Sequence, residues 1–400
     1  MTSHVEFWTS LNTLKPITSV QRRKNLPGLK KKLKDDKKKV TKQHIKITYR
    51  LAERFQRTSP EDTYIPHAEK IINEILLHCC LKESQSRKLL DLDHLNISGD
   101  GSKLKAHSSP YGKKVCACDS SFSNPCDCKR FYNSPDASWG YDHYRDCFVF
   151  GYNLYQINSW SFDNKSELPV YLTMTTGARH DSVPGMYSMQ RVTQTMAYHI
   201  DNGCFDTAHD ATDFYRMSRD LWKMRPFIPL NTTNEGNIKN LSMSCITDDG
   251  IPVCQAGYQM YYFGHEKDRD RTKWRCPIKA SKKNQNLKCD FINICSPSAY
   301  GRVIYTHPKD NPRLYTPIPR TSTKWQDTYD HRSSAERVFK REKNDFKLTS
   351  FKTRSKERLL FYALLTAIAV HVDIWYKQDN QEEIKRSSPC LISQRSCLIT

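Results

Sequence analysis

The sequence predicts an α/β protein whose core is a mixed β-sheet. Two observations predict this class: three strand-like segments follow residue 90, and helical and strand-like patterns then alternate up to residue 231. A third concerns the C-terminal region, where no glycine follows Gly301 and no proline lies between Pro319 and Pro389. Such a stretch favours long helices, so we expect helices flanking the sheet.

The expected elements divide the chain into five regions. These are a basic, helical N-terminal region (1–90), the first part of the sheet core (91–231), a β-rich insertion (232–322), the C-terminal helices of the core (323–376) and a loose tail (377–400). Within them we expect strands at 95–100, 147–157, 168–177, 203–206 and 226–231, and helices at 68–80, 184–199, 211–223, 325–348 and 355–376.

The charge of the chain limits its partners. Its 63 Lys and Arg against 43 Asp and Glu give a net charge of +20, which favours an anionic partner, nucleic acid before membrane surface. Residues 22–46 hold twelve Lys or Arg and are expected to contact phosphates or to act as a linker. The N-terminus shows no secretory signal pattern, so we expect a cytoplasmic protein. The apolar run 359–376 carries His371 and Asp373, which indicates a buried core helix.

Three carboxylates form a candidate metal site. Asp100 and Asp206 each end an expected strand, where a sheet commonly offers side chains to a site, and Glu336 lies on an expected helix. Together they would supply three hard oxygen ligands for Mg²⁺ or Mn²⁺. Asp91 and Asp93 are weaker alternatives to Asp100 because they precede the strand.

The second strand-end position has its own alternative. In CFDTAHDATDFY either Asp206 or Asp210 would serve. Asp210 precedes a helical pattern and has Asp213 three residues later, which suits a helix N-cap, so Asp206 is preferred. His209 and Asp210 are expected to face solvent or to cap the helix rather than to touch the site.

The segment YDHRSSAERVFKREK, residues 329–343, aligns four functional side chains. At about 100° per residue, Tyr329, Arg332, Glu336 and Lys343 fall in a stripe about 60° wide on one helical face. A surface helix with ion pairs would show similar spacing. Beside a metal site, Arg332 and Lys343 would instead contact phosphates.

These residues match the pattern Tyr-x2-Arg-x3-Glu-x6-Lys, so the chain resembles bacterial insertion-sequence transposases of the DDE type. The resemblance covers roughly residues 90–376. GDGSKLKAH resembles the first-Asp strand of that family, LPVYLTMTTGARHDS its third strand, CFDTAHDA its second-Asp strand and LLFYALLTAIAVHVDIWY its closing helix.

The resemblance implies a ribonuclease-H-like core with a β-rich insertion and a DNA-binding N-terminal region. It implies that Asp100, Asp206 and Glu336 bind Mg²⁺ or Mn²⁺, that Arg332 and Lys343 contact transposon-end DNA, and that Tyr329 lies against the DNA near the cleaved strand. The implied partners are double-stranded DNA, as terminal inverted repeats and target, and a second copy of the chain in a synaptic dimer at the nucleoid. An inactive DNA-binding remnant and a nuclease without strand transfer are the rival interpretations.

The fifteen cysteines are clustered rather than dispersed. Cys116, Cys118, Cys126 and Cys128 form the pattern C-x-C-x7-C-x-C, which indicates either a tetrahedral structural Zn²⁺ site or free thiols. A second, irregularly spaced set lies in the insertion, where buried thiols are the preferred interpretation and a metal site the alternative. Its members are Cys254, Cys276, Cys289 and Cys295.

Aromatic and basic residues alternate in the insertion, over GYQMYYFGHEKDRDRTKWR at 257–275. Such a mixture can stack on bases and bind phosphates. Alternating aromatics more often form the core of a sheet, which is the preferred interpretation here.

Overall fold

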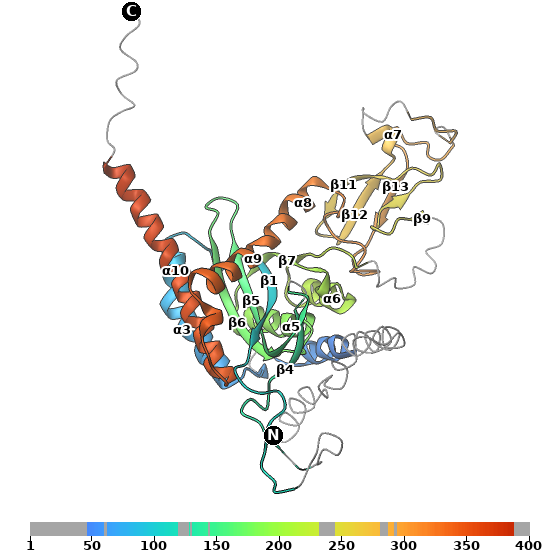
Figure 1. The fold of residues 1–400 in the computed structure, drawn as a ribbon. Helices are drawn as coiled ribbons and strands as arrows, with labels where there is room; N and C mark the ends of the chain where they lie inside the picture. The colour runs from blue at the N-terminus through green and yellow to red at the C-terminus, as the bar shows by residue number, and fades with distance from the viewer. Residues whose placement is uncertain are drawn as a thin grey trace, which may run out of the picture.

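The computed structural model describes residues 46–387 except for 60–61, 119–127, 129, 143–144, 232–244, 281–286 and 292–293. Figure 1 shows a central sheet with helices packed against it, an insertion of short strands that extends away from the sheet, and a long C-terminal helix on the opposite side. The basic segment 22–46, apart from Lys46, and the last thirteen positions of the expected tail lie outside the described residues.

The central sheet is mixed, as the sequence predicts. Its strands are β1 (Leu95–Lys105), β4 (Ser138–Asp142), β5 (Cys147–Trp160), β6 (Glu167–Thr176), β7 (Ile200–Phe205) and β8 (Arg225–Phe227). They are ordered β6-β5-β1-β7-β8, and β4 pairs with the first residues of β5. The strand β5 is antiparallel to both of its neighbours, whereas β1, β7 and β8 are parallel. Residues 151–160 of β5 are all buried because helices cover both faces of the sheet.

The first strand is longer than expected and does not end at Asp100. It continues through Lys105, which pairs with Gly151 of β5. The glycines on either side of Asp100 suggest a strand end, but both take part in the antiparallel ladder with β5. The position of Asp100 inside a strand corrects the expectation from the sequence.

Helices from distant parts of the chain cover the two faces of the sheet. The connections to and from β7 carry α5 (Ser182–Gln190), which a π-helical turn extends over Arg191–Thr195, and α6 (Thr212–Asp220). Both α5 and α3 (His67–Leu76) lie on the face that carries Tyr155 and Thr173. The opposite face carries Gln156, and α9 (Ser333–Lys340) packs there.

The helices before residue 90 are part of this same core. Residues 46–57 are helical, and α3 continues through a π turn (Leu77–Leu81) into α4 (Lys82–Ser86). Leu51, Phe55 and Leu76 belong to the same buried cluster as Ile97 of β1 and Val370 of the last helix. The boundary expected at residue 90 therefore does not separate two hydrophobic cores.

The last helix, α10 (Lys356–Ser387), is longer than expected and extends eleven residues, 377–387, into the segment predicted as a tail. Over Lys356–Asn380 it is long and apolar enough to cross a membrane by composition. One side of it packs on β6 and α3. His371 is fully buried there, within 2.8 Å of Ser84 Oγ and 2.9 Å of the Pro169 carbonyl oxygen. In this fold, α10 therefore serves as a core helix.

The insertion is rich in β-structure, as expected. Its described elements are β9 (Cys245–Ile246), β10 (Pro252–Val253), β11 (Tyr261–Glu266), β12 (Arg271–Arg275), α7 (Pro277–Ala280) and β13 (Val303–Thr306). The strands β11, β12 and β13 form an antiparallel sheet, and β9 pairs with β10. The hydrophobic core of this part is small, with Ile251, Met260 and Trp274 as its buried members.

The expected helix 325–348 is divided into four pieces. These are α8 (Thr323–Tyr329), a 3₁₀ turn (Asp330–Arg332), α9 and a π turn (Arg341–Asp345). A 3₁₀ turn winds the chain more tightly than an α-helix and a π turn winds it less tightly. The four side chains of the stripe therefore do not follow the regular spacing of a single α-helix.

Candidate active site

Asp100 and Asp206 lie side by side where β1 and β7 separate. The parallel pairing of these strands ends with Gly99 opposite Phe205. Asp100 is the next residue of β1, which continues along β5, and Asp206 is the first residue after β7. Parallel strands present successive residues at matching heights, so the two carboxylates meet at the same edge of the pairing.

Both flanks of Asp100 are covered by the α9 segment. Side chains alternate between the faces of a strand, so Ser98, Asp100 and Ser102 share one face. Ser98 Oγ lies 2.6 Å from Ser334 Oγ of α9, and Ser102 Oγ accepts a hydrogen bond from Lys343 in the π turn. The segment that carries Glu336 therefore crosses directly over the first carboxylate.

The same π turn is anchored beneath the surface. Gln156, which pairs with Asp100 in the β1–β5 ladder, donates from Nε2 to Glu342 Oε1 at 3.1 Å. Glu342 is fully buried, and burial raises its pKa to about 8, so the carboxyl group is protonated at neutral pH. This contact holds the α9 segment over the strand without adding a charge.

The environment of Asp100 disfavours its ionised form. Burial, followed by the negative charges of Asp206 and Asp181, raises the pKa of Asp100 to about 7. The backbone N–H of Gly101 donates to Asp100 Oδ1 at 2.8 Å and opposes this shift only in part. Neighbouring carboxylates retain a proton when little positive charge surrounds them. A bound cation would displace that proton.

Asp206 is held by the turn that follows β7. Its Oδ1 accepts from Ala208 N at 3.1 Å and contacts His209 Nδ1 at 2.7 Å. Burial alone would raise the pKa of Asp206, but the hydrogen bond from His209 and the charges of His209 and Arg332 lower it. Both contacts use Oδ1, so Oδ2 has no donor among the residues that the structure describes.

His209 supports Asp206 from inside the protein, which corrects the expectation that it faces solvent or caps a helix. It is completely buried, and its Nε2 lies 2.9 Å from Tyr155 Oη. Burial opposes a charge on His209, but the hydrogen bond and the negative charge of Asp206 raise its pKa. A protonated His209 orients the Asp206 carboxylate and balances part of its charge.

Asp210 is not a helix cap either. It is buried and accepts two hydrogen bonds from Arg313, from Nε at 2.8 Å and from Nη2 at 2.6 Å. The N-cap position of α6 is Ala211. The carboxylate of Asp210 therefore ties the segment returning from the insertion to the core, while Asp206 lies beside Asp100.

Glu336 is separated from the other two carboxylates. Its side chain is 56% exposed and forms an ion pair with Arg332. The oxygen atoms of Asp100, Asp206 and Glu336 are not all within 4.8 Å of one another. The structure thus brings two of the three predicted ligands together. The third, Glu336, is paired with Arg332, whose charge also lowers the pKa of Asp206.

Asp181, which the sequence analysis missed, is a third carboxylate beside Asp100. Asn153 Nδ2 donates to its Oδ1 at 2.6 Å, and Lys103 Nζ lies 4.0 Å away. A Cβ atom at position 101 would come within 2.2 Å of the same oxygen, so a larger residue there would displace the Asp181 side chain. The only signal in the sequence is its place just after the third strand, at the edge that carries the site.

The other candidate residues occupy separate places. Tyr329 stacks on Trp325 with ring centroids 4.8 Å apart, and burial raises the pKa of its phenol to about 12. Asp91 and Asp93 belong to an exposed turn before β1. A group with ligand atoms within 4.8 Å, His94, His199 and Asp201, lies at the opposite end of the β1–β7 pair from Asp100.

Three of the four cysteines in the polar loop come together. The sulfur atoms of Cys116, Cys118 and Cys128 all lie within 4.8 Å of one another, with 3.4 Å between those of Cys118 and Cys128. Sulfur atoms around a tetrahedral Zn²⁺ are about 3.8 Å apart, given Zn–S bonds of about 2.3 Å. The fourth predicted ligand, Cys126, lies outside the described residues. The three described thiols are close enough together to be ligands of one metal ion.

We expect divalent cations to stabilise the protein through Asp100. Because the folded-state pKa is raised from 3.8 to about 7, its contribution to stability is fully present below pH 3.8 and is lost as pH rises towards 7. Added Mn²⁺ should recover on the order of a few kcal/mol at most near pH 7.5. Thermal unfolding from pH 5 to 8, with and without Mn²⁺, measures this recovery.

The matched variants for that measurement are Asp100→Asn and Asp91→Asn. Asp91 is an exposed carboxylate in the turn before β1 and should leave the Mn²⁺ effect unchanged. Asp100→Asn should remove most of the effect. An equal Mn²⁺ effect in all three proteins would show that the cation binds elsewhere.

No protein-family model matches this chain, and no curated protein does.

Proposed function

We propose that this protein is a DDE transposase, which binds transposon ends and catalyses metal-dependent DNA cleavage and strand transfer. One observation carries the proposal: Asp100 and Asp206 meet beneath the segment that bears Arg332, Glu336 and Lys343. The sheet order β6-β5-β1-β7-β8, with β5 antiparallel to its neighbours, also supports a ribonuclease-H-like core. Asp206 and the helix segment that bears Glu336, 130 positions later in the sequence, thereby lie at the same part of the sheet.

The carboxylates fit Mg²⁺ or Mn²⁺ in chemistry and in electrostatics. Asp100 and Asp206 would hold the ion, because burial and the neighbouring carboxylates raise the pKa of Asp100 and a cation between the two groups would offset both effects. Glu336 would complete the set after leaving Arg332. Such ions, when bound, activate a water or hydroxyl nucleophile and stabilise the leaving oxygen in an in-line phosphodiester displacement.

Arg332 links DNA binding to the completion of this set. Its guanidinium holds Glu336 in the free protein. A DNA phosphate would compete for the same bidentate donor and release the carboxylate. Lys343, held against Ser102 beside Asp100, would contact a neighbouring phosphate, and Tyr329 would lie against the DNA near the cleaved strand.

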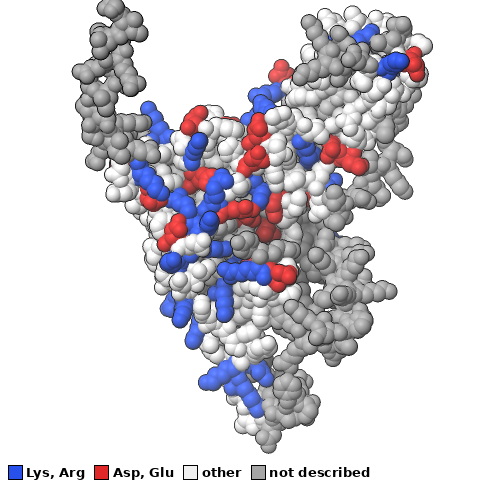
Figure 2. Space-filling view, turned by 45° about the horizontal axis from the view of Figure 1, so that its top comes forward, with Lys and Arg blue, Asp and Glu red and all other residues white. Residues whose placement is uncertain are grey.

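The charge distribution agrees with a DNA partner. Figure 2 shows many Lys and Arg over one face of the molecule, with Asp and Glu interspersed among them. Basic residues on such a face would bind the DNA backbone. The net charge of +20 agrees with this arrangement.

One face of the insertion sheet would extend the DNA contact. Alternation along β11 and β12 sends Tyr262 and Trp274 into the small core, as the sequence analysis preferred, but leaves Phe263 51% exposed. Lys273 Nζ and the Arg275 guanidinium carbon lie 5.2 and 4.5 Å from the centre of the Phe263 ring. An aromatic ring flanked by two cations can stack on a base while the cations bind phosphates.

We therefore expect Phe263→Ala to weaken DNA binding by about 1–3 kcal/mol if the ring stacks on a base. Lys273→Ala should lower the slope of log affinity against log salt by about 1, because one phosphate contact is lost. Fluorescence anisotropy at several salt concentrations measures both. Lys377→Ala on α10, an exposed lysine paired with Asp373, is the control and should behave as wild type. Unchanged affinity in Phe263→Ala would remove this face from the DNA contact.

A synaptic complex needs two copies of the chain, and α10 offers a surface for the second. Phe361, Leu365, Val372 and Tyr376 are all at least 42% exposed, and their spacing places them on one side of the helix. Their burial between two copies would remove this apolar surface from water. We propose a homodimer at the nucleoid on these grounds.

The test is an assay of cleavage and joining on a labelled duplex that ends in the terminal repeat of the element, with Mg²⁺ or Mn²⁺. A transposase nicks the duplex at the element boundary and joins the freed 3′ hydroxyl to target DNA. Nicking without joined product would indicate a nuclease. Salt-sensitive binding without nicking would indicate an inactive remnant, for which the separation of Glu336 from the aspartates is the supporting observation.

A further inference from the structure

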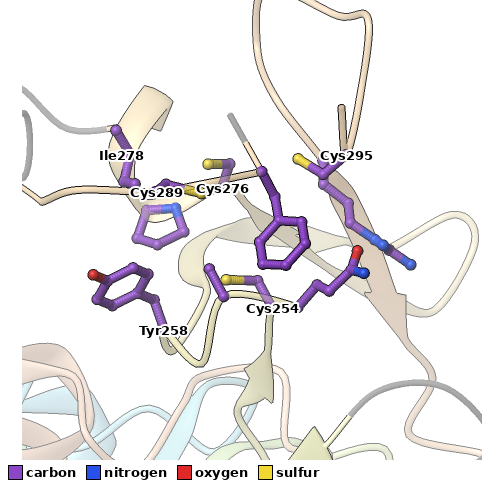
Figure 3. A pocket seen from close by; sticks show the side chains of 11 residues that line it. Cys254, Tyr258, Cys276, Ile278, Cys289 and Cys295 are labelled. Carbon is purple, nitrogen blue, oxygen red and sulfur yellow. The ribbon is translucent and has the colours of Figure 1, made fainter. Parts of the chain in front are cut away.

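The second cysteine set surrounds a cavity at one end of the insertion. Cys254 follows β10, Cys276 follows β12, and Cys289 and Cys295 belong to the segment after α7. All four line a cavity of about 20 Å³, which is room for one water-sized species. Figure 3 shows the cysteine side chains distributed around this cavity, with Tyr258 and Ile278 beside them.

Main-chain contacts fix the positions of these cysteines. Cys254 N–H donates to the Tyr258 carbonyl at 2.8 Å, and its own carbonyl accepts from Gly257 N at 2.9 Å. Gly257 has φ of +80°, a conformation that glycine adopts without strain. The result is a tight turn directly after the first cysteine, in which the thiol is presented at the end of a strand.

The second cysteine is fixed in a comparable way. Cys276 N–H donates to the Arg302 carbonyl at 2.9 Å, and a Cβ atom at position 301 would come within 2.6 Å of Cys276 Cβ. Only glycine permits this approach, and Gly301 has φ of +73°. Cys295 N–H closes a turn onto the Phe291 carbonyl at 2.9 Å. Two turns, at Cys254 and Cys295, and the backbone contact between Cys276 and Arg302 thus bring thiols to one small volume.

The insertion needs more stabilisation than its own core supplies. Its buried hydrophobic cluster consists of Ile251, Met260 and Trp274, with Cys254, Tyr262 and Ile304 packed against it. Modules that bury so few apolar side chains commonly depend on disulfides or a metal ion for stability. The four cysteines are free thiols in the structure, so disulfides do not provide this stabilisation here.

We propose that Cys254, Cys276, Cys289 and Cys295 bind one structural Zn²⁺ ion in tetrahedral geometry. No three of their sulfur atoms lie within 4.8 Å of one another, so zinc binding would draw the side chains inward. The four thiols release four protons to solvent as thiolates form, and no oxidation takes place. The site then carries a net charge of −2, which Arg302 in its lining partly offsets.

This site is independent of the proposed DNA chemistry, so its test uses the metal content and not the cleavage assay. The full chain is purified under reducing conditions, and zinc per chain is measured by mass spectrometry of the intact protein and by elemental analysis. The variants are Cys276→Ser/Cys289→Ser and, for the polar-loop cluster, Cys116→Ser/Cys118→Ser. Cys147→Ser, which removes an exposed thiol on β5, is the control.

We expect Cys276→Ser/Cys289→Ser to contain one zinc ion fewer than wild type and the control to contain the same number. If Cys116→Ser/Cys118→Ser also contains one zinc ion fewer than wild type, the two cysteine sets bind separate ions. Equal zinc content in wild type and Cys276→Ser/Cys289→Ser would overturn the proposal. A disulfide among the four cysteines, found by peptide mapping without reductant, would overturn it as well.

A second measurement needs no variant and therefore does not depend on whether the variant folds. Chelation of zinc from the wild-type chain should increase the rate of protease cleavage within residues 245–306, and added Zn²⁺ should restore resistance. Substitution with Co²⁺ should produce the sulfur-to-cobalt charge-transfer absorption of a thiolate site. Chelation without any change in cleavage of the insertion would contradict a structural role for the ion.

Discussion

Glu336→Gln is expected to reduce DNA cleavage by roughly 10³-fold while DNA affinity stays within about twofold of wild type. The amide keeps the size of the side chain but loses the charge that a divalent cation requires. Because Glu336 is exposed on α9, the substitution should not disturb the fold. The measurement compares nicking rates and anisotropy on the same terminal-repeat duplex.

The matched control is Glu74→Gln, an exposed glutamate on α3 that pairs only with Lys70 at the surface. It should cleave at the wild-type rate. Asp206→Asn should lose cleavage to the same extent as Glu336→Gln. Full activity in Glu336→Gln would exclude this carboxylate from the reaction and contradict the proposed function.

Arg191→Met is expected to destabilise the protein by about 3–5 kcal/mol, the largest stability change that we predict. The guanidinium is 1% exposed and is paired with Glu69, which is 5% exposed. Glu69 also accepts hydrogen bonds of 2.7 Å from Tyr171 Oη and Thr173 Oγ1. Removal of the arginine leaves a buried carboxylate with no counter-charge in this contact, which is costly.

Denaturant unfolding measures this change. Lys70→Met is the matched control. Lys70 neighbours Glu69 on α3, but its ion pair with Glu74 lies at the surface, where the two side chains are 60% and 52% exposed. Its effect should stay below about 1 kcal/mol. The double variant Glu69→Gln/Arg191→Met should recover part of the loss. If Arg191→Met alone were as stable as wild type, α3 would be held to the sheet by apolar packing and not by this pair.

The sequence predicts five of the six strands of the central sheet, all but β4, because their patterns are local. Aliphatic and aromatic residues recur along β5 and β6, most of whose residues are buried, and such strands are recognisable without knowledge of their partners. Asp100 and Asp206 lie side by side because each directly follows the last residue that pairs β1 with β7. The predicted end of β1 at Asp100 is wrong because β1 pairs with β5 as far as Lys105, whereas its pairing with β7 ends at Gly99.

Other features of the site depend on contacts between distant residues. Asp210 has the sequence context of a helix cap, but Arg313, 103 positions later, binds its carboxylate. His209 was expected at the surface because nothing in its neighbourhood shows that Tyr155, 54 positions earlier, encloses it. Asp181 follows a strand at the correct edge, yet many aspartates follow strands. Propensity and spacing do not report such tertiary contacts.

The contact between Ser98 and Ser334 spans 236 residues, so it has a consequence for the order of folding. The strands with Asp100 and Asp206 can pair early, whereas α9 reaches them only after the whole insertion has been synthesised. Closing a loop costs entropy that grows with the logarithm of its flexible length. If the insertion folds first, it shortens that flexible length, so the rate at which α9 docks on β1 depends on how quickly the insertion reaches its own compact state.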